Sequence, residues 1–208
     1  ADRTSGTRAW LAAAGEALWA QAAVGNGIVA LTSDAAGAAV YCRNDGVNGL
    51  ALNADGRARV KVLEIVGGSD LAERFEIRGS VAVVPGMLVS IDPDHPGELR
   101  VADRRYERAG AGVVSGGNGL AAGVMLRAEG VPMADGVHDV AMTGRVWCMA
   151  DASEGEIRPG DRLATSATPG HAMGVRDESL APGAVVGKAM TGLAAGEKGL
   201  VLVLVNLQ

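Results

Sequence analysis

The residues best suited to chemistry lie in the stretch from Gly67 to Glu76, where two carboxylates follow a glycine pair. Asp70 and Glu73 are three residues apart, so in a helical turn over residues 71–75 both would project from one face. Two carboxyl groups beside a peptide bond can divide the work of its hydrolysis, because one activates a water molecule while the other protonates the leaving amine. One hypothesis is therefore that the chain cuts its own backbone here.

A structural interpretation of the same residues competes with this hypothesis. Ser69 and Asp70 are residue types preferred at helix N-caps, and Glu73 stands where a capping box has its acid. On residue types alone, capping is the favoured interpretation and self-cleavage is the alternative. In both, the glycine pair lets the chain bend, so residues 67–76 form a hinge between two parts of different composition.

Upstream of the hinge, an N-terminal segment of residues 1–24 is expected to be helical. Residues 8–24 are rich in Ala, Leu, Glu and Gln and predict a helix of about four turns. Its apolar seam has the 3-4-3 spacing of a short coiled coil. Self-association and packing on its own chain both remain open, because so short a seam does not distinguish them.

The next segment, residues 25–66, has small side chains and frequent glycines. Its pattern predicts short strands at residues 27–31, 38–42, 49–52 and 57–66. Strands this short and this poor in bulky residues cannot enclose a core within one chain. We therefore expect several identical chains to intertwine as in a fibre shaft. An edge hairpin layer packed on the downstream domain is the alternative.

Downstream of the hinge, three sequence features recur in the same order, at offsets of 74, 73 and 72 residues. They are two Pro-Gly turns and a valine-rich strand: Pro85-Gly86 and Pro159-Gly160, His95-Pro96-Gly97 and Thr168-Pro169-Gly170, and residues 111–116 and 183–187. Pro followed by Gly favours a type II turn before each strand. We predict that residues 77–208 form a pseudo-duplicated antiparallel β-domain. The expected fold class is mainly β, with a short N-terminal helix, an intertwined small-residue β-shaft and this C-terminal domain.

The composition argues against nucleic-acid and membrane partners. The net charge is -5 and the pI is near 5.2, whereas phosphate binding needs clustered Lys and Arg. The longest apolar run, residues 200–205, is too short to cross a bilayer. We expect neither nucleic-acid binding nor membrane insertion.

No residue pattern indicates a metal or cofactor site, so neither is expected. The histidines share no ligand spacing, and the glycine-rich residues 110–116 lack the strand and helix that flank a dinucleotide loop. Cys42 and Cys148 form no CxxC pair. Two buried free thiols are therefore expected, and a disulfide between them is the alternative.

Five stretches, taken in order, resemble a known family: Gly68–Phe75, Pro85-Gly86, Gly112–Ser115, Thr143–Val146 and Pro159-Gly160-Asp161. From Val66 onward, the chain resembles a domain found at the carboxyl end of phage tail fibres, appendages and related fibre-like proteins. It is similar to the autoprocessing intramolecular chaperone domain of phage preneck appendages. Upstream of the hinge, the chain shares no motif with these proteins and resembles them only in its pattern of short strands separated by glycines.

The resemblance implies a homotrimer in a virion or extracellular fibre, with a C-terminal domain that drives trimerisation and aligns the chains. It also implies that a self-cleaving chain would be cut at Ser69–Asp70, with Asp70 and Glu73 as the assisting carboxylates. Relatives that resemble this chain can keep the fold without cutting themselves. If this chain is like them, its role is purely structural. A capsid decoration or receptor-binding module, with a host-surface receptor or a virion protein as its partner, is a further alternative.

Overall fold

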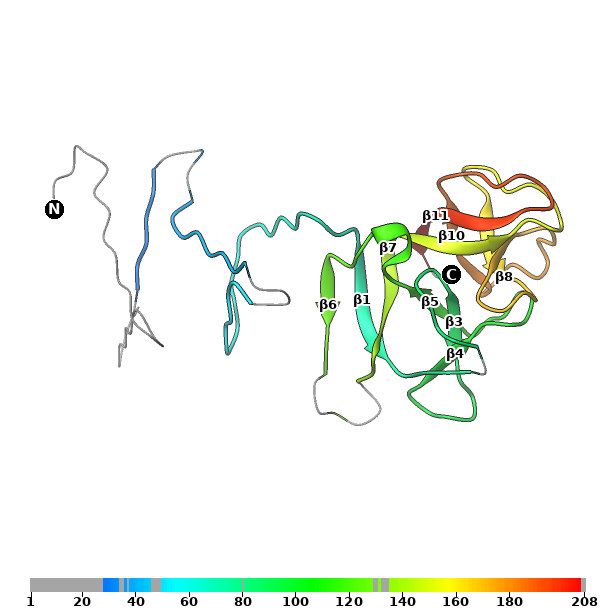
Figure 1. Cartoon of the computed structure of the whole chain (residues 1–208), viewed down its shortest axis with the longest axis horizontal. Coiled ribbons are helices and arrows are strands. Elements are labelled where there is room, and N and C mark those ends of the chain that lie inside the picture. The colour runs from blue at the N-terminus through cyan, green and yellow to red at the C-terminus, as the bar shows by residue number, and fades with distance from the viewer. Residues whose placement is uncertain are drawn as a thin grey trace. The chain divides into compact units, whose positions relative to one another are not determined.

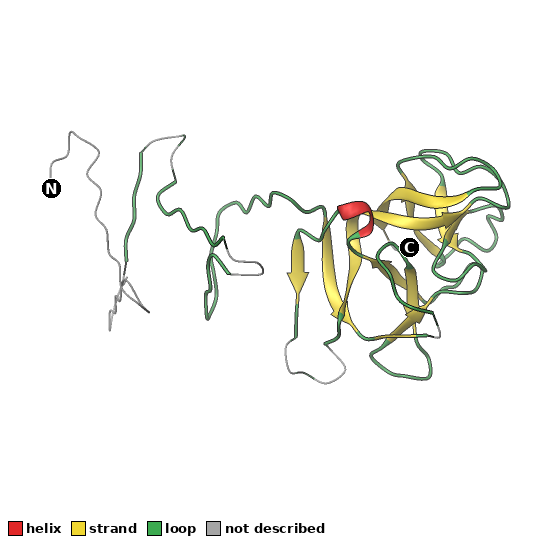
Figure 2. Ribbon diagram, viewed as in Figure 1, coloured by secondary structure: helices red, strands yellow, loops and turns green. Residues whose placement is uncertain are grey.

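The computed structural model describes residues 28–33, 36, 38–45, 50–79, 81–128, 131 and 135–206. The chain divides into two compact units, Ala1–Lys61 and Val62–Gln208. Figure 1 traces it from blue to red, and Figure 2 shows that the described strands all lie in the second unit. The helix predicted at residues 8–24 lies outside the described residues.

The described residues of the first unit form neither helix nor strand, and all of them are exposed. The strands expected at 27–31, 38–42 and 49–52 are absent from their described residues, and the strand expected at 57–66 is absent as well. A strand needs a neighbour that completes its backbone hydrogen bonds. The prediction of strands here is wrong for the single chain, because none of its described segments pairs with these residues.

The second unit is built of strands joined by turns (Figure 2). Its described elements in chain order are β1 (Asp70–Phe75), β2 (Ile77–Arg78), β3 (Leu88–Ile91), β4 (Leu99–Val101), β5 (Gly110–Val114), the 3-10 turn η1 (Gly117–Gly119), β6 (Val124–Leu126), β7 (His138–Asp151), β8 (Arg162–Thr165), β9 (Ala172–Gly174), β10 (Val185–Ala189) and β11 (Lys198–Asn206). No helix in the described part of the chain has the length and apolar character needed to span a membrane.

A closed barrel of five strands forms the second half of this unit. Strand β7 pairs with β9, β9 with β8, β8 with β10, β10 with β11, and β11 returns to β7. The returning ladder is long, and runs from the pair Lys198–Asp151 to the pair Asn206–Thr143. Each of these strands therefore has a partner on both sides within the barrel.

The first half of the unit repeats this strand order. Strand β3 pairs with β4 and β5, just as β8 pairs with β9 and β10. One shift of 73 residues relates the parallel pair Ile77–Leu99 to the parallel pair Ala150–Ala172. The Pro-Gly turns stand just before β3 and β8, and their glycines have φ values of 94° and 95°.

The predicted fold class is nevertheless wrong. No helix or strand precedes β1 in the described residues, and the sheet is mixed rather than antiparallel. Parallel pairing joins β1 to β6, β2 to β4, and β7 to β9. The helical turn expected over residues 71–75 is part of β1, because this segment pairs with β6 on one edge and β7 on the other. Pairing with distant strands overrides the local capping preference.

Two apolar clusters form the core, one confined to the first half and one that fills the barrel and extends into the first half through Leu88 and Val113. The first includes Met87, Val89, Leu99, Val114 and Val140, and the second includes Val146, Cys148, Ile157, Leu163, Val201 and Val203. Burial raises the pKa of the Cys148 thiol to about 12, so this thiol stays protonated. Cys42 is exposed and free, so the expectation of a buried thiol is wrong at that position.

Replacing Leu163 with alanine should destabilise the second unit, because this fully buried side chain lies in the barrel core. The expected loss is about 2–5 kcal/mol in the free energy of unfolding, measured by denaturant titration. The matched control is Leu180→Ala, at a leucine that is 46% exposed, with an expected change below about 0.5 kcal/mol. Equal losses in the two variants would contradict this assignment of the core.

Candidate functional site

The Ser69–Asp70 peptide lies where the chain enters β1, which runs between β6 and β7 (Figure 1). On one side, the Arg145 N–H donates to the Ser69 carbonyl oxygen at 3.0 Å, and the Ser69 hydroxyl donates to the Arg145 carbonyl oxygen at 2.7 Å. On the other side, the Gly123 N–H donates to the Asp70 carbonyl oxygen at 2.9 Å. Both neighbouring segments therefore hold this peptide in place.

Two glycines let neighbouring backbone approach this peptide closely. Gly144 has a φ of +106°, and a Cβ at this position would lie 2.5 Å from the Ser69 carbonyl oxygen. A Cβ on Gly68 would lie 2.3 Å from the Cα of Gly123. Neither position has room for a side chain, so glycine is required at both.

The Asp70 side chain is buried, with 5% of the residue exposed. The Ser115 hydroxyl donates to Asp70 Oδ2 at 2.9 Å, whereas Oδ1 is buried with no hydrogen-bond partner among the described residues. Burial raises the pKa of the Asp70 carboxyl, the Ser115 hydrogen bond opposes this shift, and the charge of Asp139 adds to it. Because Oδ1 is buried without a hydrogen bond, the charged carboxylate is disfavoured at this position relative to water.

Glu73 does not join Asp70 in the structure. Both residues lie on β1, where successive side chains alternate between the two faces, so residues three apart point to opposite sides. Their Cα atoms are about 10 Å apart along an extended strand. The expectation that the two carboxylates share one face is therefore wrong, because it depended on a helical turn.

The residues around Asp70 come from distant positions that sequence analysis did not select for this site. Ser115 directly follows β5, and its N–H donates to the Asp139 carbonyl oxygen at 2.8 Å. The Asp139 side chain in turn accepts a hydrogen bond from Arg74 at 3.1 Å. No local spacing links these residues, since only the pairing of β1 and β5 with β7 brings them together. The one signal for Arg145 was its place in a stretch that carried the family resemblance.

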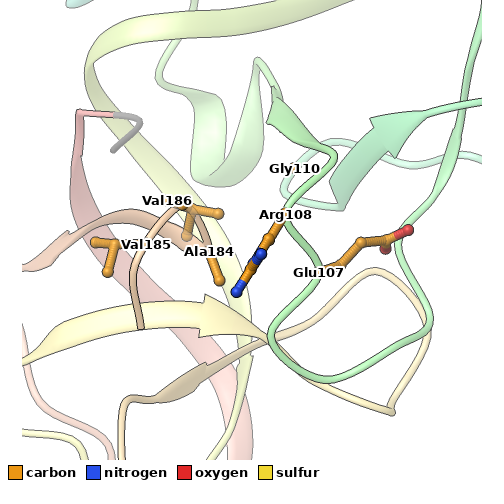
Figure 3. A pocket seen from close by; sticks show the side chains of 7 residues that line it. Glu107, Arg108, Gly110, Ala184, Val185 and Val186 are labelled. Atoms are coloured by element: carbon orange, nitrogen blue, oxygen red, sulfur yellow. The ribbon is translucent and has the colours of Figure 1, made fainter. Parts of the chain in front are cut away.

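A separate hollow lies between the two halves of the second unit, where the start of β5 faces the start of β10 (Figure 3). Its volume is about 240 Å³, and its lining consists of Glu107, Arg108, Gly110 and residues 183–186. The Arg108 side chain extends toward Ala184, whereas Glu107 turns away and accepts a hydrogen bond from Ser90 at 2.8 Å. The lining thus contains one available cation and no pair of groups suited to acid–base catalysis.

The residues described here contain no group of three or more His, Cys, Asp or Glu side chains that could hold a metal ion. The groups that lie at the site are the Ser69–Asp70 peptide, its hydrogen-bond donors and the buried carboxyl of Asp70, whose pKa burial raises.

The arrangement of strands has a counterpart among solved structures. The fold resembles that of a phage protein. The crystal structure of the pre-mature bacteriophage phi29 gene product 12 matches 73% of this chain with a TM-score of 0.50 and 16% sequence identity. The match covers 24% of that protein, so the matched part of this chain corresponds to about a quarter of its length. At this identity the likeness is one of fold.

No family model matches the sequence, and no curated protein matches it. The resemblance to phage appendage domains is therefore supported in its coarse form, as a similarity in fold to a phage protein.

Replacing Asp70 with asparagine should stabilise the second unit relative to the wild type, and this stabilisation should increase with pH. In the folded chain the pKa of Asp70 is raised above the usual 3.8. The Asp70 carboxyl therefore contributes its full stabilisation at pH values below its unfolded-state pKa, and this contribution is lost as pH rises through the raised pKa. Asparagine has no charge to bury. The gain in unfolding free energy should therefore be smallest below the ordinary aspartate pKa and grow steadily as pH rises above it.

Denaturant titration at pH values below and above the ordinary aspartate pKa measures the effect. Asp94→Asn is the matched control, because Asp94 is exposed and outside the site, and it should show no such trend. An effect of Asp70→Asn that is the same at every pH would contradict the burial of an ionisable Asp70.

Proposed function

We propose that this chain is a structural component of a homotrimeric, phage appendage-like fibre or spike. In this proposal the second unit drives trimerisation and aligns the three chains, and the protein belongs to a virion or an extracellular fibre. The likeness in fold to phage phi29 gene product 12 supports a phage structural role. The observation that carries the trimer is the uncovered apolar surface upstream of β1.

Large apolar side chains of residues 28–66 are exposed in the described part of this segment, each by at least 42%. They are Ile28, Val29, Leu31, Val40, Tyr41, Leu50, Leu52, Val60, Val62, Leu63, Ile65 and Val66. Monomeric soluble proteins rarely leave so much apolar surface in water. Full burial of one such side chain contributes about 1.5–3 kcal/mol, so association that covers this segment is strongly favoured.

Sister chains are the partner that fits this segment best. Within residues 28–66, the described part has neither apolar cover nor strand pairing. Parallel copies of the same segment can supply both together. The number three comes from the sequence resemblance to phage appendage domains, which implies a trimer.

Light scattering of the full chain tests the assembly. We expect a mass three times that of the 21.0 kDa chain. The double variant Leu31→Asp with Leu52→Asp should shift the mass toward the monomer, because it places charges where apolar side chains would be buried. The matched control Leu180→Asp changes an exposed leucine of the second unit and should leave the trimer intact. A monomeric full chain would remove the fibre assignment.

Self-cleavage of the Ser69–Asp70 bond is a second candidate function, and the surroundings of that bond favour it. The Arg145 N–H donates to the Ser69 carbonyl oxygen, where negative charge develops as water adds. Asp70 retains a proton to a higher pH than an ordinary aspartate, because burial raises its pKa. The related phage structure is that of a pre-mature form, which is in keeping with a processing step.

The proposed reaction is a single hydrolysis. Water adds to the Ser69 carbonyl carbon, the C–N bond breaks, and the Asp70 nitrogen takes a proton as it leaves. The products are a carboxyl terminus at Ser69 and an amino terminus at Asp70. Glu73 would be the second carboxylate, and this role requires an arrangement of β1 other than the strand, in which it faces away from Asp70.

A denaturing gel with mass spectrometry of the refolded chain tests this second function. Cutting should yield two fragments, residues 1–69 and 70–208, and both Asp70→Asn and Glu73→Ala should slow their appearance by about 100-fold or more. Glu76→Ala, at an exposed acid just after β1, is the matched control and should cut at the normal rate. A single intact band from the refolded wild-type trimer would contradict self-cleavage and leave the structural role unaffected.

A further inference from the structure

We infer that the free edge of β6 receives residues 62–66 of a second copy of the chain as an added strand. The inference rests on the proposed trimer and names the surfaces through which the second units contact one another.

Strand β6 is a three-residue edge strand that contains no Lys, no Pro and no bulge, and Arg127 follows directly after it. Among the described residues it pairs only with β1, so its other edge is open (Figure 1). Met125 and Leu126 are 41% and 49% exposed, and as sequence neighbours on a strand they lie on opposite faces. Natural edge strands are usually blocked by Lys, by Pro or by a bulge. Residues 116–126 contain no charged residue and no proline, so this edge is suited to accept another strand.

Residues 62–66 have the complementary character. Val62, Leu63, Ile65 and Val66 are 80%, 69%, 42% and 88% exposed. In an extended chain these side chains alternate between two faces, so Leu63 and Ile65 form an apolar face and Val62 and Val66 flank Glu64 on the other. The apolar face of the segment can pack beside the exposed Met125 or Leu126 of β6, while Glu64 stays on the opposite face.

A chain cannot pair its own residues 62–66 with this edge. Both edges of β1 are already occupied, by β6 and by β7. The Ser69 N–H donates to the Ala121 carbonyl oxygen, and Gly68 packs directly against Gly123. The chain is thus fixed beside residues 121–123 from Gly68 onward. Gly67 alone is too short to reverse the chain and reach the far side of β6, about 10 Å from β1.

The two surfaces differ from each other, and this difference favours a ring. One copy donates residues 62–66 and the next copy accepts them on β6, so the contact is heterologous and closes when the rotation between copies is a third of a turn. A contact of β6 with β6 would instead be isologous and would produce a dimer. A heterologous contact between residues 62–66 and β6 is therefore compatible with a closed trimer.

Disulfide trapping between two different chains tests the pairing. Both chains carry Cys42→Ser, and Cys148 is fully buried, so it stays out of the reaction. One chain carries Leu126→Cys, and the other, enlarged by a tag, carries either Val62→Cys or Leu63→Cys. After refolding the chains together under oxidising conditions, we expect a mixed dimer on a non-reducing gel. One of the two donor positions should give about tenfold more product, because they lie on opposite faces.

Each other result would overturn the inference in a distinguishable way. Crosslinking of Leu126→Cys chains to one another would show a β6–β6 contact. A trimer by light scattering without any mixed dimer would refute this pairing and keep the proposed function. A monomer would refute both.

A charge on the edge provides an independent measurement. Leu126→Lys should weaken trimer assembly. The protein concentration at which the trimer dissociates should rise by about tenfold or more. Met190→Lys, at a methionine 43% exposed on the other half of the unit, is the matched control and should assemble normally. Equal assembly of the two variants, with circular dichroism showing both folded, would also overturn the inference.

Discussion

The structure depends on one long strand, β7, which belongs to both halves of the second unit. Its first part pairs with β1 and β5, and its later part pairs with β9, while β11 runs along much of its length. The two halves meet at Gly144, which lies opposite Asp70 on one edge and opposite Val205 on the other. The Ser69–Asp70 peptide is therefore attached at the junction of the halves, so both halves must be folded for it to take its observed position.

Local turn chemistry made part of this fold predictable, whereas pairing between distant strands did not. The Pro-Gly turns at Gly86 and Gly160 require positive φ and mark where β3 and β8 begin. The spacing of these turns does not indicate that β11 closes a barrel on β7. It also does not indicate that β2 pairs in parallel with β4, or β9 with β7, because register is decided by packing across the sheet. The same limit explains the error over residues 71–75. Ser69 and Asp70 have good capping side chains, but β6 and β7 provide stronger pairing.

The site shows a similar division between local and distant information. Sequence analysis selected Ser69, Asp70 and Glu73 by residue type, but it placed both acids on one face because it assumed helical periodicity. The buried environment of Asp70 is made by Ser115 and by strands that follow much later in the chain, so neither its raised pKa nor its unpaired oxygen could be predicted. Upstream, the expectation that sister chains shield residues 25–66 stays a prediction; in the single chain, the large apolar side chains in the described part of residues 28–66 are exposed. A receptor or virion partner remains a prediction.

The closure of the barrel by β11 has a consequence for biosynthesis. The ribosome makes residues 28–66 before β11, yet the β11 edge of β7 stays unpaired until β11 has emerged. Residues 28–66 are thus translated well before the unit that would align them in the proposed trimer. In that trimer, the second units of nascent chains could align the chains only after β11 has left the ribosome.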